Sequence, residues 1–191
     1  MSMSAMAIHF ATRISRADAG NVDAGAPDLD AVYRAEIRRM IGLASVLMGS
    51  RAAGEDLAHD AFLQVLRRAG GEPGYLRSPA WPLLRTVLVR LAIQRRRSIA
   101  REARRLGHLW QQPDSEWWDP DPALIDWHVA LGALPPRMRA CAVLFYGEDM
   151  SVADVARALQ RSPRTVEHQL EAARFKLAHA LRARRGEDTA S

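Results

Sequence analysis

The chain has 191 residues, a formal net charge of +5 and a single cysteine, Cys141. One cysteine excludes an internal disulfide and a cysteine-based zinc site, and the apolar run around it predicts a buried packing thiol. No apolar run reaches the roughly 18 residues that a membrane span needs, and no secretory signal is evident. We therefore expect a soluble cytoplasmic protein, and the positive charge is compatible with a polyanionic partner.

Helical periodicity dominates the chain, and no segment alternates with the period of a strand over a useful length. Residues 1–27 predict a disordered tail, because they are rich in small and polar side chains without a sustained period. Apolar stripes then predict helices over residues 28–48 and 50–69, and a third helix from about residue 79 past residue 97. We expect these helices to form one small domain, residues 28–106.

A change of composition marks the middle of the chain. Residues 107–122 are rich in proline, tryptophan and aspartate, which predicts a linker rather than a long helix. Helical pattern resumes in residues 123–134, breaks at two prolines and continues to the last helix. We predict a second domain over residues 123–185 and a short tail, 186–191. The expected fold class is all-α, with two small helical domains joined by this linker.

A helix-turn-helix is predicted within residues 151–170, so the second domain contains one. Ser151 and Asp154 have capping-box spacing at the start of a short amphipathic helix. Gln160 and the following arginine form the turn, and Ser162 caps a second helix that begins with proline. The second helix turns Val166 and Leu170 inward and leaves polar side chains on its open faces. A helix of this kind enters the major groove, which predicts DNA recognition.

A basic stripe follows the third helix. Its arginines are accompanied by one acid, Glu102, and are Arg85, Arg90, Arg95, Arg96, Arg97, Arg101, Arg104 and Arg105. Helical spacing places Arg90, Gln94, Arg97 and Arg101 on one face. Because pairing within the helix cannot neutralise so many cations, we expect phosphate contacts rather than a merely solvated face.

Two aromatic residues, Tyr75 and Trp81, stand beside this stripe. Aromatic side chains next to basic ones stack on unpaired bases, but Trp81 equally fits the helical core. An acidic face on the second helix has the opposite character, with Glu55, Asp56 and Asp60 around His59. No nucleophile accompanies these carboxylates, so they indicate either a basic protein partner or a solubilising surface.

Three segments carry a family resemblance. GEDLAHDAFLQVLRR, SPAWPLLRTVLVRLAIQRRR and ALGALPPRMRACAVLFYGEDMSVADVARALQRSPRTVEHQLEAARFKL resemble bacterial RNA polymerase sigma factors of the extracytoplasmic-function group, over about residues 29–181. The resemblance implies a protein without catalytic activity or cofactor of its own. Such a protein binds core polymerase, recognises and melts promoter DNA, and can be held by an anti-sigma factor.

The resemblance also implies site residues. Glu55, Asp56, His59 and Asp60 correspond to the helix that docks on the clamp helices of the polymerase's largest subunit. The minus-ten element corresponds to Tyr75, Trp81, Arg85, Arg90, Gln94, Arg97 and Arg101. The minus-thirty-five element corresponds to Arg161, Ser162, Arg164, Thr165, Glu167, His168 and Glu171, in the domain that also packs on the polymerase flap. The linker would occupy the RNA exit path.

Some positions depart from the family pattern. Arg90 and Gln94 replace the usual asparagine and aspartate, and Glu167 with His168 replaces a basic residue and serine. Glutamate accepts a hydrogen bond from cytosine N4 but repels phosphate, so we expect an unusual promoter sequence. Gln160 stands where relatives have a turn glycine, and a left-handed conformation there costs a non-glycine residue about 1 kcal/mol.

Two other functions are compatible with parts of the sequence. The run of residues 162–168 also resembles the helix-turn-helix of quorum-sensing-type response regulators, which bind duplex DNA without polymerase. That alternative leaves the acidic face and the arginine stripe unused. A metal-dependent nuclease has little support, because the six histidines lack the close spacing of metal ligands and no phosphate-cradling glycine loop is present.

Overall fold

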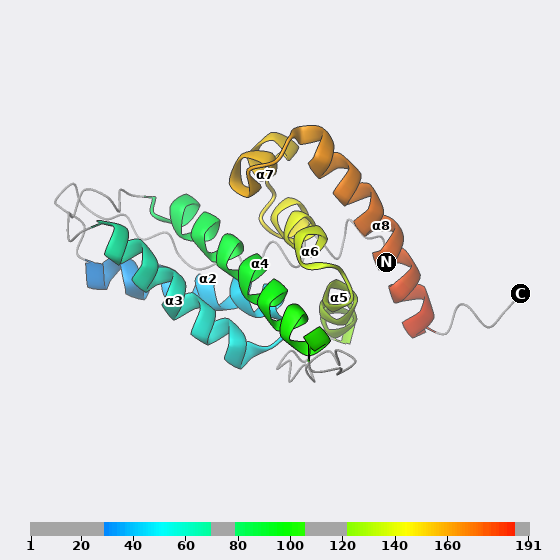
Figure 1. The fold of residues 1–191 in the computed structure, drawn as a ribbon, viewed down its shortest axis with the longest axis horizontal. Helices are drawn as coiled ribbons and strands as arrows, with labels where there is room; N and C mark the ends of the chain where they lie inside the picture. Colours follow the sequence, from blue (N-terminus) through cyan, green and yellow to red (C-terminus); the bar gives the residue numbers. More distant parts are fainter. Residues whose placement is uncertain (1–28, 70–78, 106–121, 186–191) are drawn as a thin grey trace, which may run out of the picture.

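A computed structural model describes residues 29–69, 79–105 and 122–185, and every regular element in these ranges is helical. The predicted all-α class is therefore confirmed (Figure 1). In chain order the elements are α2 (Leu29–Met48), α3 (Arg51–Ala69), α4 (Trp81–Arg105), α5 (Pro122–Gly132), α6 (Pro136–Ala142), the π-helix η2 (Val143–Gly147), α7 (Val152–Leu159) and α8 (Pro163–Arg185). Both predicted tails, nearly all of the predicted linker and Tyr75 lie outside the described residues.

The N-terminal helices α2, α3 and α4 pack on one another through their apolar stripes. Leu43 and Leu47 of α2, Leu57 of α3 and Leu84 and Leu88 of α4 are among the largest fully buried side chains. Helix α2 ends where the next residue, a glycine, adopts a φ of +81°. This left-handed conformation favours glycine and lets the chain turn into α3.

The closest approach of α2 and α3 occurs at Gly54. A Cβ atom placed on this residue would lie 2.5 Å from the backbone nitrogen of Ser45 and 2.6 Å from its Cα. The clashing atoms of Ser45 belong to its backbone, so a change of side-chain rotamer cannot relieve the clash. The two helices therefore depend on a residue without a side chain at this crossing.

We expect Gly54→Ala to lower the free energy of unfolding by about 1–3 kcal/mol, because the added methyl group forces α2 and α3 apart. Alanine otherwise favours a helix over glycine by about 1 kcal/mol. Gly42→Ala is the matched control, since a Cβ there meets no atom within 4 Å. Urea denaturation of both variants measures the difference, and equal midpoints would contradict this explanation.

The C-terminal helices form a second layer around α8. Trp127 and Leu131 of α5, Leu144 of η2 and Leu177 of α8 are fully buried there. Cys141 of α6 is also buried, and burial raises the pKa of its thiol to about 11, which confirms the predicted packing cysteine. No helix in the described ranges is long and apolar enough to cross a membrane.

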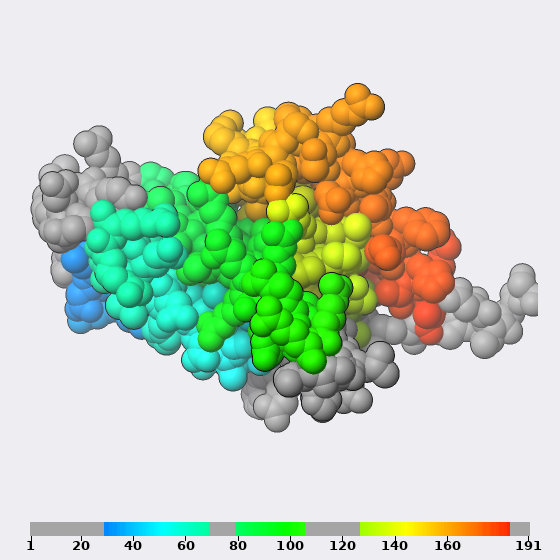
Figure 2. Space-filling view, in the orientation of Figure 1, coloured from blue at the N-terminus to red at the C-terminus, as the bar shows by residue number. Residues whose placement is uncertain are grey.

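The two groups of helices lie against each other. Helix α4 packs against α6 and α7, and α2 packs against α5 and α6 (Figure 1). In the space-filling view α4 runs between α3 on one side and α6 and the α7 turn on the other (Figure 2). The buried apolar side chains of both groups join in one continuous core.

Candidate nucleic-acid interface

The helix-turn-helix consists of α7, a turn and the first part of α8. The Ser151 hydroxyl accepts a hydrogen bond from the backbone N–H of Asp154 at 3.1 Å and donates one to its carboxylate at 2.7 Å. That second bond lowers the pKa of Asp154, and the charge of Arg157 acts in the same direction. The predicted N-cap of α7 is thus confirmed, and it fixes where the motif begins.

The turn has the conformation that its sequence predicts. Gln160 adopts φ 53° and ψ 55°, the left-handed region, and ends α7. The backbone N–H of Arg161 closes the turn on the Ala156 carbonyl at 2.9 Å. The Ser162 hydroxyl then accepts the backbone N–H of Thr165 at 3.2 Å, so α8 begins with a capped first turn.

Side chains on α8 divide into a buried and an open face. Val166 and Leu170 are buried against the core, as predicted. The exposed set contains every residue predicted for the minus-thirty-five element, namely Arg161, Ser162, Arg164, Thr165, Glu167, His168 and Glu171. A shallow surface recess joins four of them, and Arg174, which no sequence pattern indicated, completes its lining.

The acidic face of α3 is partly paired. Glu55 accepts Arg51 at 2.8 Å, and Asp60 accepts Arg95 of α4 at 3.2 Å. The exposed His59 ring is 2.9 Å from the hydroxyl of Tyr33. Asp56 is exposed and makes no ion pair within the part of the chain described. Exposed pairs of this type contribute about 0–1 kcal/mol, so the face remains available to a partner.

A buried ionic cluster joins the two groups of helices. The Glu148 side chain follows η2, has no exposed surface, and receives three donors on its Oε2 atom. Trp81 Nε1 donates at 2.8 Å, Arg39 at 3.1 Å and Arg85 at 3.3 Å. The Arg39 guanidinium also lies 3.9 Å from the centre of the Trp81 ring. These four residues are called the Glu148 cluster below.

The Glu148 cluster decides between the two expectations for Trp81, which is 6% exposed and packs in the core here. Helix α4 contains few acids of its own, but Arg85 and Arg95 are both paired. Their acidic partners, Glu148 and Asp60, come from other parts of the chain. Nothing in the sequence around Glu148 distinguishes it from an exposed loop residue. Its role could therefore not be predicted from the sequence.

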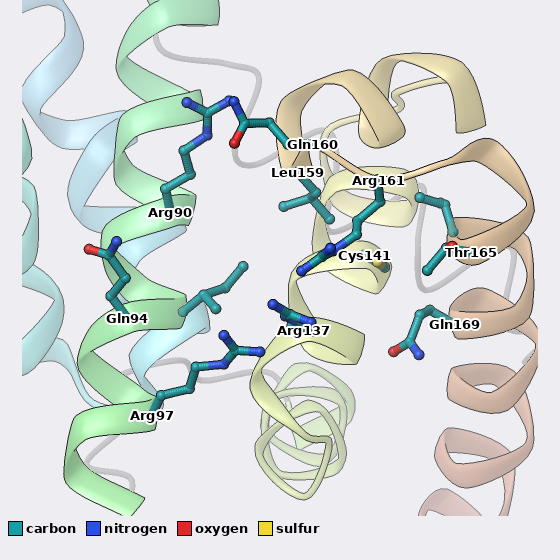
Figure 3. Close-up of a pocket in the computed structure, with 12 residues that line it drawn as sticks. Arg90, Gln94, Arg97, Arg137, Cys141, Leu159, Gln160, Arg161, Thr165 and Gln169 are labelled. Atoms are coloured by element: carbon teal, nitrogen blue, oxygen red, sulfur yellow. The ribbon is translucent and has the colours of Figure 1, made fainter.

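The rest of the basic face of α4 is turned toward the helix-turn-helix. Arg90 Nε donates to the carbonyl of Ala158 in α7 at 3.2 Å. Gln94 and Arg97 are exposed. They line a cavity between α4 and the helix-turn-helix, together with residues of α6 and α8 (Figure 3). Arg101 is exposed nearer the end of α4. The stripe is therefore divided between contact with the C-terminal helices and solvent.

Two arginines converge on the carboxyl end of α2, where backbone carbonyls lack helical partners. Arg96 of α4 donates to the Met48 carbonyl at 2.8 Å, and Arg139 of α6 donates to Leu47 at 3.1 Å and to Gly132. Burial lowers the pKa of Arg96 to about 10 and that of Arg139 to about 9, the latter assisted by the charge of Arg96. Neither arginine is on the surface, contrary to the stripe expected for Arg96.

Comparisons with known proteins agree with this geometry. Residues 124–177 match the family model "Sigma-70, region 4". Among solved structures the chain is similar to the sigma factor RpoE from Bartonella quintana, in a co-crystal with the anti-sigma factor NepR, with a TM-score of 0.64 and 18% sequence identity. That similarity covers 81% of this chain and 97% of RpoE. A comparison with curated proteins gave no match.

Among the residues described, no group of three or more histidine, cysteine, aspartate or glutamate side chains is arranged to hold a metal ion. The recognisable features are instead a capped helix-turn-helix, an arginine-rich helix and an acidic helix face. The region 4 match contains the helix-turn-helix, and the RpoE fold extends over both groups of helices. The comparisons thus show a sigma-70 region 4 over residues 124–177 and a fold similar to that of RpoE.

Proposed function

We propose that the chain is an RNA polymerase sigma factor of the extracytoplasmic-function group. Its acidic face on α3 docks on the clamp helices of the largest polymerase subunit, through Glu55, Asp56, His59 and Asp60. The helix-turn-helix then reads the minus-thirty-five element, and its domain contacts the flap. The observation that carries this proposal is the open face of α8, where Arg164, Thr165, Glu167 and His168 are exposed over a buried apolar face. The protein acts in the cytoplasm as a binding subunit without chemistry of its own.

Helix α4 is proposed to hold the minus-ten element and the melted strand. Phosphates would contact Arg97 and Arg101, and each phosphate neutralised on duplex DNA steepens the salt dependence by about 0.9 log units. Trp81, Arg85 and Arg90 are engaged with Glu148 and Ala158 here, so they reach DNA only after α4 separates from α6 and α7. We therefore propose that the arrangement in Figure 1 is a closed resting state that polymerase binding opens.

The structure of RpoE contains a bound anti-sigma factor, NepR. We include a partner of that kind in the proposal, because a protein that grips both groups of helices would stabilise the closed state. The stand-alone regulator makes a different prediction, since its isolated chain should shift duplex DNA. In the sigma factor, by contrast, DNA binding should be weak until core polymerase is added.

Asp56→Lys is expected to weaken association with core polymerase about tenfold or more, because it places a like charge opposite a basic surface. The fold should be unaffected, since Asp56 is exposed. Glu102→Lys makes the same change of charge on the exposed end of α4 and serves as the matched control. The association constant is measured by titration of labelled polymerase. If Asp56→Lys and Glu102→Lys bind polymerase with equal affinity, Asp56 is not part of the docking surface.

A further inference from the structure

A cavity of ≈ 270 Å³ opens between α4 and the helix-turn-helix (Figure 3). Its lining comes from α4, α6, the end of α7, the turn that follows it, and α8. It consists of Arg90, Ile93, Gln94, Arg97, Arg137, Cys141, Leu159, Gln160, Arg161, Thr165, Val166 and Gln169. The close-up shows the guanidinium groups of Arg97, Arg137 and Arg161 directed into the same space. Side chains from both groups of helices thus face one another across it.

All the charged side chains in the lining are positive. It contains four arginines and no carboxylate. Across the described ranges, Arg97, Arg137 and Arg161 make no ion pair, whereas Arg39, Arg85 and Arg95 each meet an acid elsewhere. Partial desolvation lowers the pKa of Arg137, and the nearby charges of Arg97 and Arg161 lower it further. These cations repel one another across the closed interface, so an anion placed among them would relieve that repulsion.

The chemistry of the lining favours phosphate over carboxylate. The guanidinium fork binds phosphate oxygens in pairs, and the three groups directed into this space carry more charge than one carboxylate can balance. Thr165 and Gln169 add a hydroxyl and an amide group to the lining for further hydrogen bonds. The cavity is also too small for a helix of a partner protein, whose diameter is about 10 Å or more.

We propose that this cavity binds an anion with two or more linked phosphate groups, and that the anion holds α4 against the helix-turn-helix. The arginines come from both sides of the interface, so a bound anion stabilises the closed arrangement by linkage. Competition with promoter DNA for Arg90, Arg97 and Arg161 follows only if the function proposed above is right. Binding itself does not depend on that function.

The test uses the full chain, inorganic pyrophosphate and tripolyphosphate, at constant ionic strength. Calorimetric titration should give saturable binding of one anion per chain and a melting temperature that rises with its concentration. Arg97→Ala with Arg161→Ala should weaken binding by about tenfold per lost guanidinium. The control pairs Arg104→Ala with Arg182→Ala, two exposed arginines outside the cavity, so that net charge falls equally.

Loss of affinity in the cavity variant alone supports the site. Equal loss in both double variants, or no saturable binding, overturns it, because charge screening alone would then explain any effect. A trinucleotide of single-stranded DNA is titrated in parallel, to separate a free oligophosphate from a nucleic-acid backbone. Tighter binding of the trinucleotide at the same arginines would contradict a free anion as the occupant. Polymerase association is not read out here, so failure of the proposed function would not appear as failure of this site.

Discussion

Replacement of Glu148 by alanine is expected to lower the free energy of unfolding by about 3 kcal/mol. The carboxylate is fully buried and is the shared acceptor of Trp81, Arg39 and Arg85. Its removal leaves the indole N–H and two guanidinium groups without that acceptor in a region from which water is largely excluded. Because these donors belong to α2 and α4 and the acceptor follows η2, the loss falls on the interface between the two groups of helices.

Two measurements check this expectation. Urea denaturation gives the change in stability, and small-angle scattering reports whether the variant expands as α4 separates from α6 and α7. Glu102→Ala is the control, because it removes an exposed carboxylate from α4. A Glu148→Ala protein with the stability and the scattering profile of the control would show that the Glu148 cluster does not hold the interface.

The same variant tests the proposed resting state. If the closed arrangement limits access to α4, Glu148→Ala should form promoter complexes at lower concentrations of polymerase than the unaltered chain. The comparison is made at a temperature where both proteins are folded. If the variant expands but forms promoter complexes at the same polymerase concentration, Glu148 stabilises the interface without limiting access to DNA. That result would contradict the proposed resting state.

Arg139→Ala should cost at least about 3 kcal/mol of stability, which makes it the second large effect. Its side chain is fully buried, and it donates to carbonyls at the ends of α2 and α5. Truncation leaves both carbonyls without this donor and also creates a cavity. Arg139→Met fills part of that cavity without restoring the hydrogen bonds, so an intermediate loss is expected.

The control for Arg139 lies two residues earlier on the same helix. Arg137 is exposed and repelled by its neighbours, so Arg137→Ala should change stability by no more than about 0.5 kcal/mol. Urea midpoints with unchanged slopes provide the measurement. If Arg139→Ala and Arg137→Ala unfold at the same urea concentration, burial of Arg139 contributes nothing to the fold.

Local features of this protein could be predicted from sequence because local chemistry determines them. The caps at Ser151 and Ser162 and the left-handed residue Gln160 depend on neighbours within a few positions, and the structure contains all three. Apolar spacing likewise places Val166 and Leu170 in the core. Periodicity does not foresee the π-helix Val143–Gly147 that follows α6, since an apolar run is compatible with several helical windings.

Long-range partners could not be predicted, for a physical reason. Glu148 lies 67 residues from Trp81 and 109 from Arg39, and no pattern in one sequence relates such positions. Arg96 and Arg139 carry charges that usually indicate a surface, yet both satisfy the carboxyl end of α2 in the interior. Burial of these arginines depends on tertiary packing that composition does not describe.

The attachments between the two groups of helices are distributed along α4 rather than gathered at one point. Trp81 and Arg85 meet Glu148 near its start, and Arg90 meets Ala158 further on. A separate attachment joins Arg139 of α6 to the carboxyl end of α2. The nine residue steps from Trp81 to Arg90 extend about 14 Å, so the first half of α4 is held at two separate points, and the end of α2 is held at a third. Breaking one of these attachments allows little movement of α4 relative to the C-terminal helices while the others remain. Separation of the two halves should therefore be cooperative, with a high activation barrier and few intermediate states.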